Sequence, residues 1–310
     1  MSIHDSQRKQ ALSGLLDAYT DRPLPGISTI QAKNVFLEQI VESEHRTRFV
    51  QAVQQRPISD LRMDPSSELF DPVRAAILQR NEGNFDEAFW LIFLFVHFGK
   101  NKKSAYRLVR DVYGRLGTGT RWDWEATSQD TFGFRMWLDK NQKELKDKTV
   151  HRAFGNHRKY QSLDAWKVAG TGAVIESYVQ WVHPPRTHQE LFASIAEGPK
   201  TKGEAFQRAY KEMSKVVSFG RTARFDYLTM VGKLALADIK PDSTYMHAAT
   251  GPADGARLLF CGAHNARVSA KTLEMWSVHL GNHLGLDMQV VEDSFCNWQK
   301  SPDVMIRFRG

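Results

Sequence analysis

The stretch Asp86–His97, DEAFWLIFLFVH, decides how this chain folds. Its apolar part, Ala88–Val96, contains no polar residue. A run of this length exceeds most strands, and it falls far short of the ~18 residues that span a bilayer. We therefore expect a helix buried in the core of a protein that does not enter a membrane.

Apolar residues recur at helical spacing along the rest of the chain, and alternating strand patterns are nearly absent. Two helices are expected upstream, one ending before Pro23 and one before Pro57. Downstream helices are expected at 104–116, 133–146, 172–182, 203–217, 222–237, 255–261 and 271–284. Gln289–Val291 and Val304–Phe308 could each form a short terminal strand.

No flexible linker, repeat or low-complexity tract divides the chain. The prediction is an all-α fold, a compact multi-helix domain with at most short strands near the C-terminus. An N-terminal helical portion at 1–80 and a helical catalytic domain at 81–310 are expected to form one continuous globule.

Composition narrows the class of partner. The 310 residues include 42% hydrophobic ones, enough for a sizeable core, and the formal net charge is +7. A basic excess favours a polyanionic partner, although a solvated basic surface without a partner explains it equally well. The two cysteines have no metal-ligand spacing, and the first residues lack the apolar core of a signal peptide. We therefore expect an intracellular protein.

The segment FGKNKKSAYRLVRDVYG at 98–114 carries a dense set of cations. On a helix, Lys103, Arg107 and Arg110 share one face, and Lys100 precedes them on the same stripe. Asp111 follows Arg107 by four residues and could orient that guanidinium. Phosphate or pyrophosphate would neutralise such a stripe, whereas a solvated basic face held by Asp111 is the alternative.

The loop GTGTRWDWE at 117–125 follows directly and carries two tryptophans. Tryptophans in a polar loop beside a basic helix can stack on nucleic-acid bases. For Trp122 or Trp124 taken alone, a hydrophobic contact that starts the next helix is the more common role.

Two further Phe-Gly turns lead into cations, FGNHRKY at 154–160 and FGRTARFDYL at 219–228. A turn that opens a helix offers backbone N–H groups to an anion, and nearby cations strengthen this binding. The candidate side chains of the two turns are His157, Arg158, Lys159, Tyr160, Arg221, Arg224 and Asp226.

The segment TGPADGARLL at 250–259 has the residues of a helix start. Thr250 can cap, Pro252 suits a first turn, and Gly255 permits close approach of another backbone. Asp254 is a possible base and Arg257 an anion ligand, although a well-capped helix start alone explains the pattern.

Other familiar sites lack support. His279 and His283 have metal-ligand spacing, but no third ligand or HExxH pattern accompanies them, so we expect no metal site. The chain also contains no P-loop, GxGxxG or GxSxG motif.

Taken together, FGKNKKSAYRLVRDVYG, FGNHRKYQSL, FGRTARFDYLTMVGKL and TGPADGARLLF resemble a bacteriophage DNA-hypermodification family. This family is the amino acid:DNA transferases, close to the α-glutamyl/putrescinyl-thymine pyrophosphorylases. The resemblance runs from about Phe89 to Phe260 and could extend to the C-terminus, whereas the first 80 residues carry nothing that matches.

The resemblance implies a phage-encoded enzyme of thymidine hypermodification in the host cytoplasm. Its partner would be double-stranded DNA that carries 5-hydroxymethyluracil as a pyrophosphate ester. The enzyme would replace the pyrophosphate with an amine, with the α-amine of an amino acid such as glycine favoured. No cofactor is required, although Mg²⁺ could accompany the leaving group.

This chemistry suggests roles for the candidate residues. Pyrophosphate or DNA phosphate would be bound by Lys100, Arg107, Arg110, Arg158, Lys159, Arg221, Arg224 and Arg257. The possible bases or orienting groups are Asp111, Asp226, Asp254 and His157. Of these, we expect Asp226 to orient and Asp254 to accept the proton of the amine. Trp122, Trp124 and Tyr160 are candidates for base stacking.

Two other functions stay open from the sequence. GNHLG at 281–285 and the acidic pair Glu292–Asp293 are compatible with a helical DNA glycosylase. The basic segments are also compatible with a non-catalytic DNA-binding protein, whose binding would be salt-sensitive and indifferent to base modification.

Overall fold

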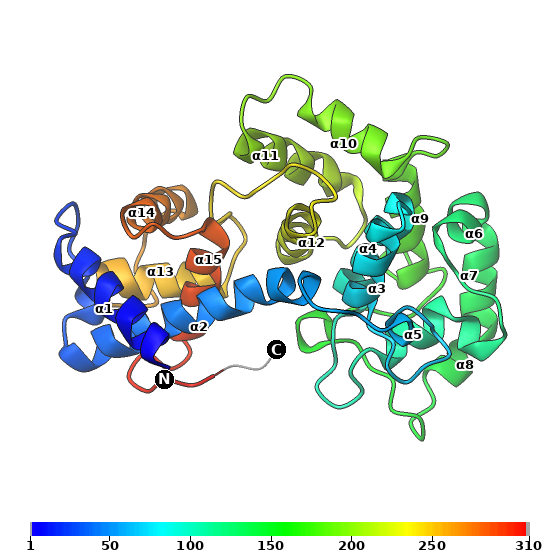
Figure 1. Ribbon diagram of the computed structural model, residues 1–310, viewed down its shortest axis with the longest axis horizontal. Helices are drawn as coiled ribbons and strands as arrows, with labels where there is room; N and C mark the ends of the chain where they lie inside the picture. The colour runs from blue at the N-terminus through cyan, green and yellow to red at the C-terminus, as the bar shows by residue number, and fades with distance from the viewer. Residues whose placement is uncertain (1, 308–310) are drawn as a thin grey trace. The chain divides into compact units, whose positions relative to one another are not determined.

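The computed structural model describes residues 2–307, and within them the fold is all-α, which confirms the predicted class (Figure 1). No strand forms in this part of the chain. Asn101 and Ala105 make an isolated antiparallel bridge inside a loop.

The helices belong to two compact units. Unit 1 joins the residues up to Ala52 with those from Pro241 onward, and unit 2 is Val53–Lys240. These boundaries differ from the division at residue 80 expected from the sequence, because the last helices share a core with the first ones.

Unit 1 holds the two ends of the described chain. Its core contains Phe36, Phe295 and Trp298, and Phe36 packs edge-on to Trp298 with ring centroids 5.0 Å apart. Gly255 lets two helices touch, since a Cβ there would lie 2.3 Å from the Phe295 carbonyl oxygen. The helices are α1 (Ile3–Asp17), α2 (Ile30–Gln54, whose last residues belong to unit 2), α13 (Gly251–Cys261), α14 (Ala270–His283) and α15 (Met288–Trp298).

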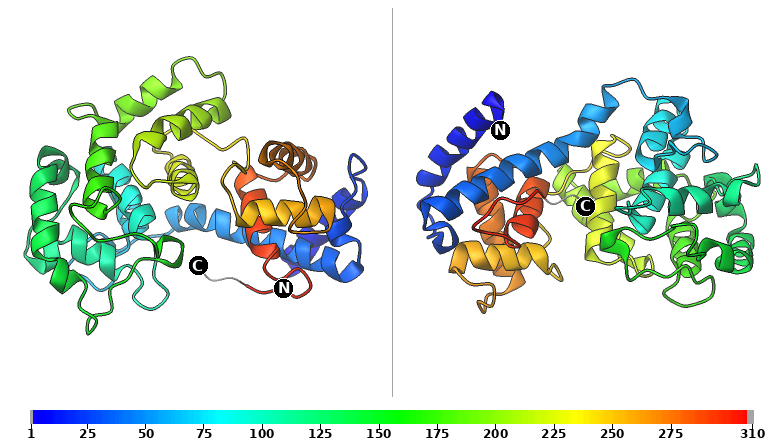
Figure 2. Two further views of the ribbon diagram at one scale, coloured as in Figure 1. Left: turned by 180° about the vertical axis from the view of Figure 1, so that it is seen from behind. Right: turned by 90° about the horizontal axis from the view of Figure 1, so that it is seen from below.

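Unit 2 carries the central apolar run. Its helices are α3 (Pro72–Asn81), α4 (Phe85–Phe98), α5 (Arg107–Tyr113), α6 (Trp124–Gln129), α7 (Thr131–Lys140), α8 (Gln142–Leu145), α9 (Thr171–Val182), α10 (His188–Ala196), α11 (Lys202–Glu212) and α12 (Arg221–Lys233). In Figures 1 and 2 the cyan α4 lies between the green helices that follow it and the yellow α12.

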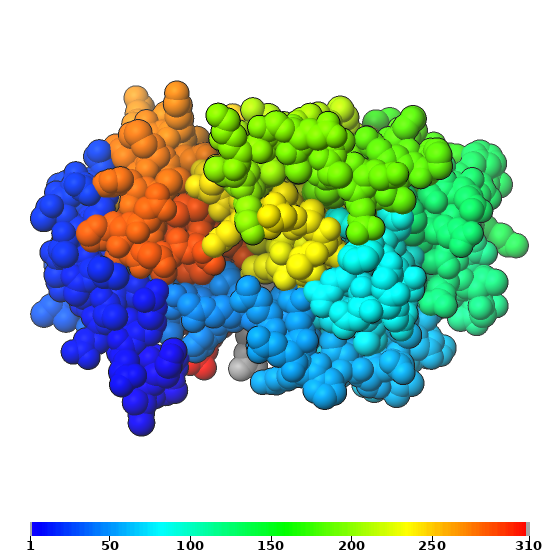
Figure 3. Space-filling model, turned by 45° about the horizontal axis from the view of Figure 1, so that its top comes forward, coloured from blue at the N-terminus to red at the C-terminus, as the bar shows by residue number. Residues whose placement is uncertain are grey.

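Helix α4 is the core of unit 2, as its apolar run predicts. It packs against α3, α5, α6, α10 and α12, and every residue of Ala88–Leu94 is buried. Figure 3 shows one outer face of this unit, where the green residues of α10 lie next to the cyan residues around the start of α4. A helix that is apolar all round is stable only when other elements cover its whole circumference.

Aromatic rings fill the space around α4. The Phe93 ring stacks on Tyr178 of α9, with centroids 3.7 Å apart, and on Phe219 before α12 at 5.2 Å. The Trp90 indole donates to the Trp122 carbonyl oxygen at 2.8 Å, which ties the 117–123 loop to the same core.

The prediction of terminal strands was wrong. Gln289–Val291 lies inside α15, where Val291, Phe295 and Trp298 recur at helical spacing and face the core of unit 1. Residues 304–307 have no regular structure, and Phe308 lies outside the described residues. None of the helices in residues 2–307 has the length and hydropathy that a transmembrane segment requires.

Replacement of a core ring tests the central place of α4. We expect Phe93→Ala to lower the free energy of unfolding by about 3–5 kcal/mol, because it leaves a cavity among stacked rings. Phe132→Ala is the control, since that ring is 63% exposed and should cost less than about 1 kcal/mol. Urea unfolding of the full chain, followed by tryptophan fluorescence, measures both. Equal costs would contradict the central role of α4.

Candidate active site

Two of the predicted Phe-Gly turns meet at the C-terminal end of α4. The Gly155 amide donates to the Phe98 carbonyl oxygen at 2.8 Å, and the Asn101 side chain donates to the Phe154 carbonyl at 3.0 Å. A Cβ on Gly155 would lie 2.9 Å from the backbone nitrogen of Lys100. Only glycine allows this approach, so the repeated Phe-Gly pattern reflects a backbone junction.

Arg158 locks this junction in place. Its Nε donates to the Val96 carbonyl at the end of α4 at 2.6 Å, and its Nη2 lies 2.8 Å from an oxygen of Asp226 on α12. The side chain of Arg158 is buried, so its guanidinium is committed to protein partners. Asp226 therefore pairs with a distant arginine and not with Arg224, its neighbour in sequence.

The junction presents exposed lysines on two loops, 99–106 and 155–160, which we call the lysine loops. Their lysines form no ion pair among the described residues, and the neighbouring His157 is also exposed. Tyr160 is 88% exposed, and Lys159 lies over its ring at 5.0 Å. This surface could meet phosphates, and the lysines are Lys100, Lys102, Lys103 and Lys159.

Helix α5 is shorter than the sequence predicts, which breaks the expected cationic stripe. The Asn101 side chain accepts hydrogen bonds from the amides of Lys103 and Ser104, and this turn takes the place of a helical start. Lys100 and Lys103 therefore lie in the loop, and only Arg107 and Arg110 are helical.

The two α5 arginines share a carboxylate from another segment. Glu68 lies 3.4 Å from Arg107 and 2.8 Å from Arg110. Asp111 is buried between the guanidinium groups of Arg110 at 2.9 Å and Arg152 at 2.5 Å, and not against Arg107. Asp111 is thus placed as an orienting group for arginines.

The third Phe-Gly turn, Phe219–Gly220, comes directly before α12, whose Asp226 pairs with Arg158 of the 155–160 loop. Phe219 packs into the core against Phe93, while Arg221 is buried with its guanidinium 4.8 Å from the Phe225 ring. Arg224 covers the ring of Tyr210 and donates to the carbonyl oxygen of that residue at 3.1 Å. Both arginines serve the packing of α12 in this structure.

The predicted stacking tryptophans lie in the core. Trp122 is 5% and Trp124 8% exposed. The Trp124 ring lies 4.5 Å from the His188 ring, and the Arg115 guanidinium covers Trp122 at 3.6 Å. Neither ring is presented to a base, because tertiary packing takes both faces, whereas Tyr160 is presented.

The remaining candidates lie in unit 1. On α13, Asp254 pairs with Arg257 at 2.9 Å, and Pro252 occupies the first turn as predicted. Thr250 makes no side-chain cap, contrary to expectation. Among the glycosylase-like residues, Gly281 is closely packed, since a Cβ there would lie 2.8 Å from Met288, and Asp293 forms an ion pair with Arg46 at 2.7 Å.

The paired histidines of α14 have structural contacts. His283 hydrogen-bonds to the Leu15 carbonyl oxygen at 2.8 Å, and its ring packs edge-on to Tyr19. Among residues 2–307, no three side chains of the metal-ligating types His, Cys, Asp and Glu come together as a metal site.

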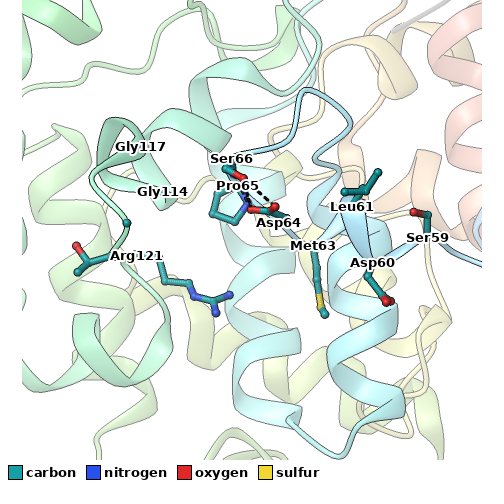
Figure 4. A pocket seen from close by; sticks show the side chains of 12 residues that line it. Ser59, Asp60, Leu61, Met63, Asp64, Pro65, Ser66, Gly114, Gly117 and Arg121 are labelled. Carbon is teal, nitrogen blue, oxygen red and sulfur yellow. Dashed lines mark hydrogen bonds between the residues drawn. The ribbon is translucent and has the colours of Figure 1, made fainter.

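Unit 2 has two adjoining hollows, of which the second lies at the N-terminal end of α4. The first, of about 770 Å³, lies between the 59–66 segment and the 114–121 loop, and Figure 4 shows Arg121 extending across it. The second, of about 660 Å³, shares Met63 and Arg121 with the first and is lined by Asp86, Glu87 and Tyr113 among others. We call the second one the α4 hollow.

Glu87 lies at the α4 hollow with an unusual environment for a carboxyl. One oxygen accepts from the Tyr113 hydroxyl at 2.6 Å and the other from the Trp124 amide at 2.6 Å. Burial raises the pKa of Glu87 from 4.5 to about 7, because the two hydrogen bonds and Arg121 only partly offset the loss of solvent. Its neighbour Asp123 adds to the rise.

The pKa of the adjacent Asp86 is shifted in the opposite direction. One of its oxygens accepts from the His188 ring at 2.6 Å and from the His188 amide at 2.7 Å. Burial raises the pKa of Asp86, but these hydrogen bonds outweigh it, so the net pKa is lowered from 3.8. The other nitrogen of His188 continues a buried chain to the hydroxyls of Tyr178 and Tyr227.

The sequence patterns did not predict Asp86, Glu87, Tyr113 and Arg121 as site residues. The sequence does contain a signal for them, namely two acidic residues in the first turn of the most apolar helix. When other elements cover such a helix, they also remove part of its first turn from water. From Glu87 to Phe98 the helix rises by about 16 Å, so the α4 hollow and the lysine loops are separate places on unit 2.

Glu87→Gln should change how stability depends on pH. Between pH 4.5 and 7 the unfolded chain ionises Glu87 while the folded protein keeps it protonated, so the contribution of Glu87 to stability falls as pH rises. Relative to the variant, the wild type should therefore lose about 3 kcal/mol from pH 4.5 to above 7.

The measurement is the urea midpoint of both proteins at pH 5 and at pH 8. Other groups titrate equally in the two proteins, so their difference isolates Glu87. A difference that is the same at both pH values would mean that Glu87 ionises normally in the folded state.

A known enzyme family covers most of the chain. The model of alpha-glutamyl/putrescinyl thymine pyrophosphorylase clade 3 matches residues 31–310, which include all of unit 2. No curated protein and no solved structure matches the chain. The chain therefore belongs to the alpha-glutamyl/putrescinyl thymine pyrophosphorylases, a family of enzymes that hypermodify thymine.

Proposed function

We propose that this protein replaces the pyrophosphate of 5-pyrophosphoryloxymethyluracil in DNA with an amine, and that the donor is an amino acid such as glycine. The family match over residues 31–310 is the observation that carries the proposal. The substrate would be phage DNA in the cytoplasm of the host cell.

The exchange requires cations where the leaving group develops charge. Arg107 and Arg110 are suited to this role, because they share the single, 73% exposed side chain of Glu68, which pyrophosphate oxygens could displace. Asp111 would hold the Arg110 guanidinium in position through its ion pair at 2.9 Å. The released pyrophosphate could carry Mg²⁺.

The lysine loops support binding of the DNA backbone. Their lysines are exposed and lack carboxylate partners in the described chain, and exposed lysines bind phosphate as compact charges. Tyr160 is the exposed aromatic ring of this surface and is suited to stack on a base. Arg158 and Asp226 would act as positioning residues, since they join the loops to α4 and α12.

The proposed reaction can be measured directly. DNA that carries 5-pyrophosphoryloxymethyluracil is incubated with the protein and ¹⁵N-labelled glycine, digested to nucleosides and analysed by mass spectrometry. We expect a nucleoside with glycine attached through nitrogen and one pyrophosphate released for each. Control DNA with unmodified thymine should give neither product.

A different product would contradict the proposal. Release of free base would indicate a glycosylase, and unchanged nucleosides with each of the twenty amino acids and with diamines would rule out the transfer reaction.

The lysine loops should set the salt dependence of DNA binding. We expect the combined replacement of Lys100, Lys102, Lys103 and Lys159 by Ala to weaken DNA binding and to flatten the plot of log K against log salt. Removal of one lysine–phosphate interaction lowers the slope by about 0.9, so removal of four would lower it by about 3.6. Fluorescence anisotropy with a labelled duplex at several salt concentrations measures the slope.

A matched control separates direct phosphate binding from net charge. It replaces four lysines that are already paired with carboxylates at 2.6–2.7 Å, namely Lys9, Lys33, Lys202 and Lys215. Equal slopes for the two quadruple variants would show that the lysine loops are no special DNA-binding surface.

A further inference from the structure

The α4 hollow carries groups of both charges. Asp86 and Glu87 lie on one side at the start of α4, and Arg121 reaches it from the 117–123 loop. Arg121 forms no ion pair among the described residues. Its guanidinium is close enough to the Tyr113 hydroxyl to offset part of the rise that burial causes in the pKa of that hydroxyl. Neither the family match nor the sequence motifs assign these residues a role.

We propose that the α4 hollow is the donor site of the enzyme, where it binds the primary ammonium group of the incoming amine, and that Glu87 accepts the proton this group must lose. This inference rests on the proposed function, since it names the place and the base for the same transfer.

The geometry of Glu87 suits a base that is held still. A carboxylate offers about four lone-pair positions, and the hydrogen bonds from Tyr113 and Trp124 take one on each oxygen. A lone pair on each oxygen is left for the donor. Because both partners belong to the core around α4, the carboxylate cannot swing away from the hollow.

Asp86 complements Glu87 as a carboxyl whose pKa is lowered, which favours its ionised form. Both hydrogen bonds from His188 go to the same oxygen of Asp86, so the other oxygen is left for an ammonium N–H. Burial lowers the pKa of His188, so this imidazole is neutral and leaves the charge of Asp86 intact. One carboxylate that stays ionised beside one that can take a proton near neutrality is a common arrangement of acid–base sites.

The step balances without a further reactant. The donor R–NH₃⁺ transfers one proton to the Glu87 carboxylate, and the resulting R–NH₂ attacks the methylene carbon on C5 of the base. A C–N bond forms while the C–O bond to pyrophosphate breaks, and the electron pair leaves with pyrophosphate. Water then takes the proton from Glu87.

The groups that face Glu87 decide the expected pH dependence. They are Asp86 on its own helix, Tyr113 of α5, and Arg121 and Asp123 of the following loop, together with the Trp124 amide. Because the reaction needs the ionised form, kcat/KM should fall on the acid side of about pH 7.

Two substitutions test Glu87 through the pH–rate profile. Glu87→Gln should lower kcat/KM at pH 8 by about 100-fold or more and abolish the acidic limb. Tyr113→Phe removes a hydrogen bond that stabilises the carboxylate, so the limb should move to higher pH while the rate at high pH persists. A purely structural role for Glu87 would leave the position of the limb unchanged in Tyr113→Phe.

Two controls accompany these variants. Glu125→Gln removes an exposed carboxylate at the rim of the hollow and should keep the acidic limb in place. Asp254→Asn removes the base expected from the sequence and should also keep the limb. Loss of the limb in Asp254→Asn, with its retention in Glu87→Gln, would overturn the inference.

Arg121 distinguishes the two kinds of primary amine. An amino acid has a carboxylate that Arg121 can bind, whereas a diamine such as putrescine has none. We expect Arg121→Gln to raise the KM for glycine about tenfold or more and to leave the KM for putrescine unchanged or lower. An equal effect on both amines would remove Arg121 from the donor site.

The experiment separates this inference from the proposed function. Transfer by the wild type with an unchanged rate and limb in Glu87→Gln would overturn the inference alone. No transfer by the wild type would overturn the proposed function. Saturation-transfer NMR with glycine and with putrescine would then test whether the α4 hollow binds these amines, independently of the transfer reaction. Equal binding of both amines by wild type and Glu87→Gln would overturn the inference, and loss of binding in the variant would support it.

Discussion

Helix α4 can be buried on every side because its polar side chains lie only near its two ends. Its first turn carries Asp86 and Glu87, its last carries His97, and the residues between them are apolar. The first turn is therefore partly buried together with the helix, and its two carboxyls line the α4 hollow. Burial of these carboxylates follows from the packing of α4, and their hydrogen bonds to His188, Tyr113 and Trp124 follow from that burial.

Because α4 is covered along its length, the lysine loops and the α4 hollow lie at its opposite ends. At the C-terminal end of α4, the close approach of Gly99 and Gly155 aligns two loops that carry exposed lysines. At the N-terminal end, the hollow offers a protonatable carboxyl and a guanidinium. The exposed lysines suit a polyanion such as DNA, and the charged groups of the α4 hollow suit a small amine. The transfer of an amine to a DNA base, which we propose as the function, needs both kinds of partner.

The sequence was sufficient for features that depend on local pattern. The helical class follows from the period of apolar residues, and the buried α4 follows from the length of its apolar run. The family resemblance was confirmed over a longer range. Features that depend on distant contacts were out of reach. Asp226, expected to act as an orienting group, pairs with Arg158 of a distant segment, and Trp122, a candidate for base stacking, packs in the core. Proximity in sequence does not determine which carboxylate meets which arginine, because α12 and the 155–160 loop meet only in the folded chain.

The packing of α4 shifts the pKa values of two neighbouring carboxyls in opposite directions, upward for Glu87 and downward for Asp86. ¹³C NMR titration of the side-chain carboxyl carbons of the full-length wild-type protein measures both groups at once. We expect Glu87 to titrate with a pKa near 7 and Asp86 with a pKa below 3.8. Titration of both carboxyls at the ordinary values of their residue types would contradict this claim.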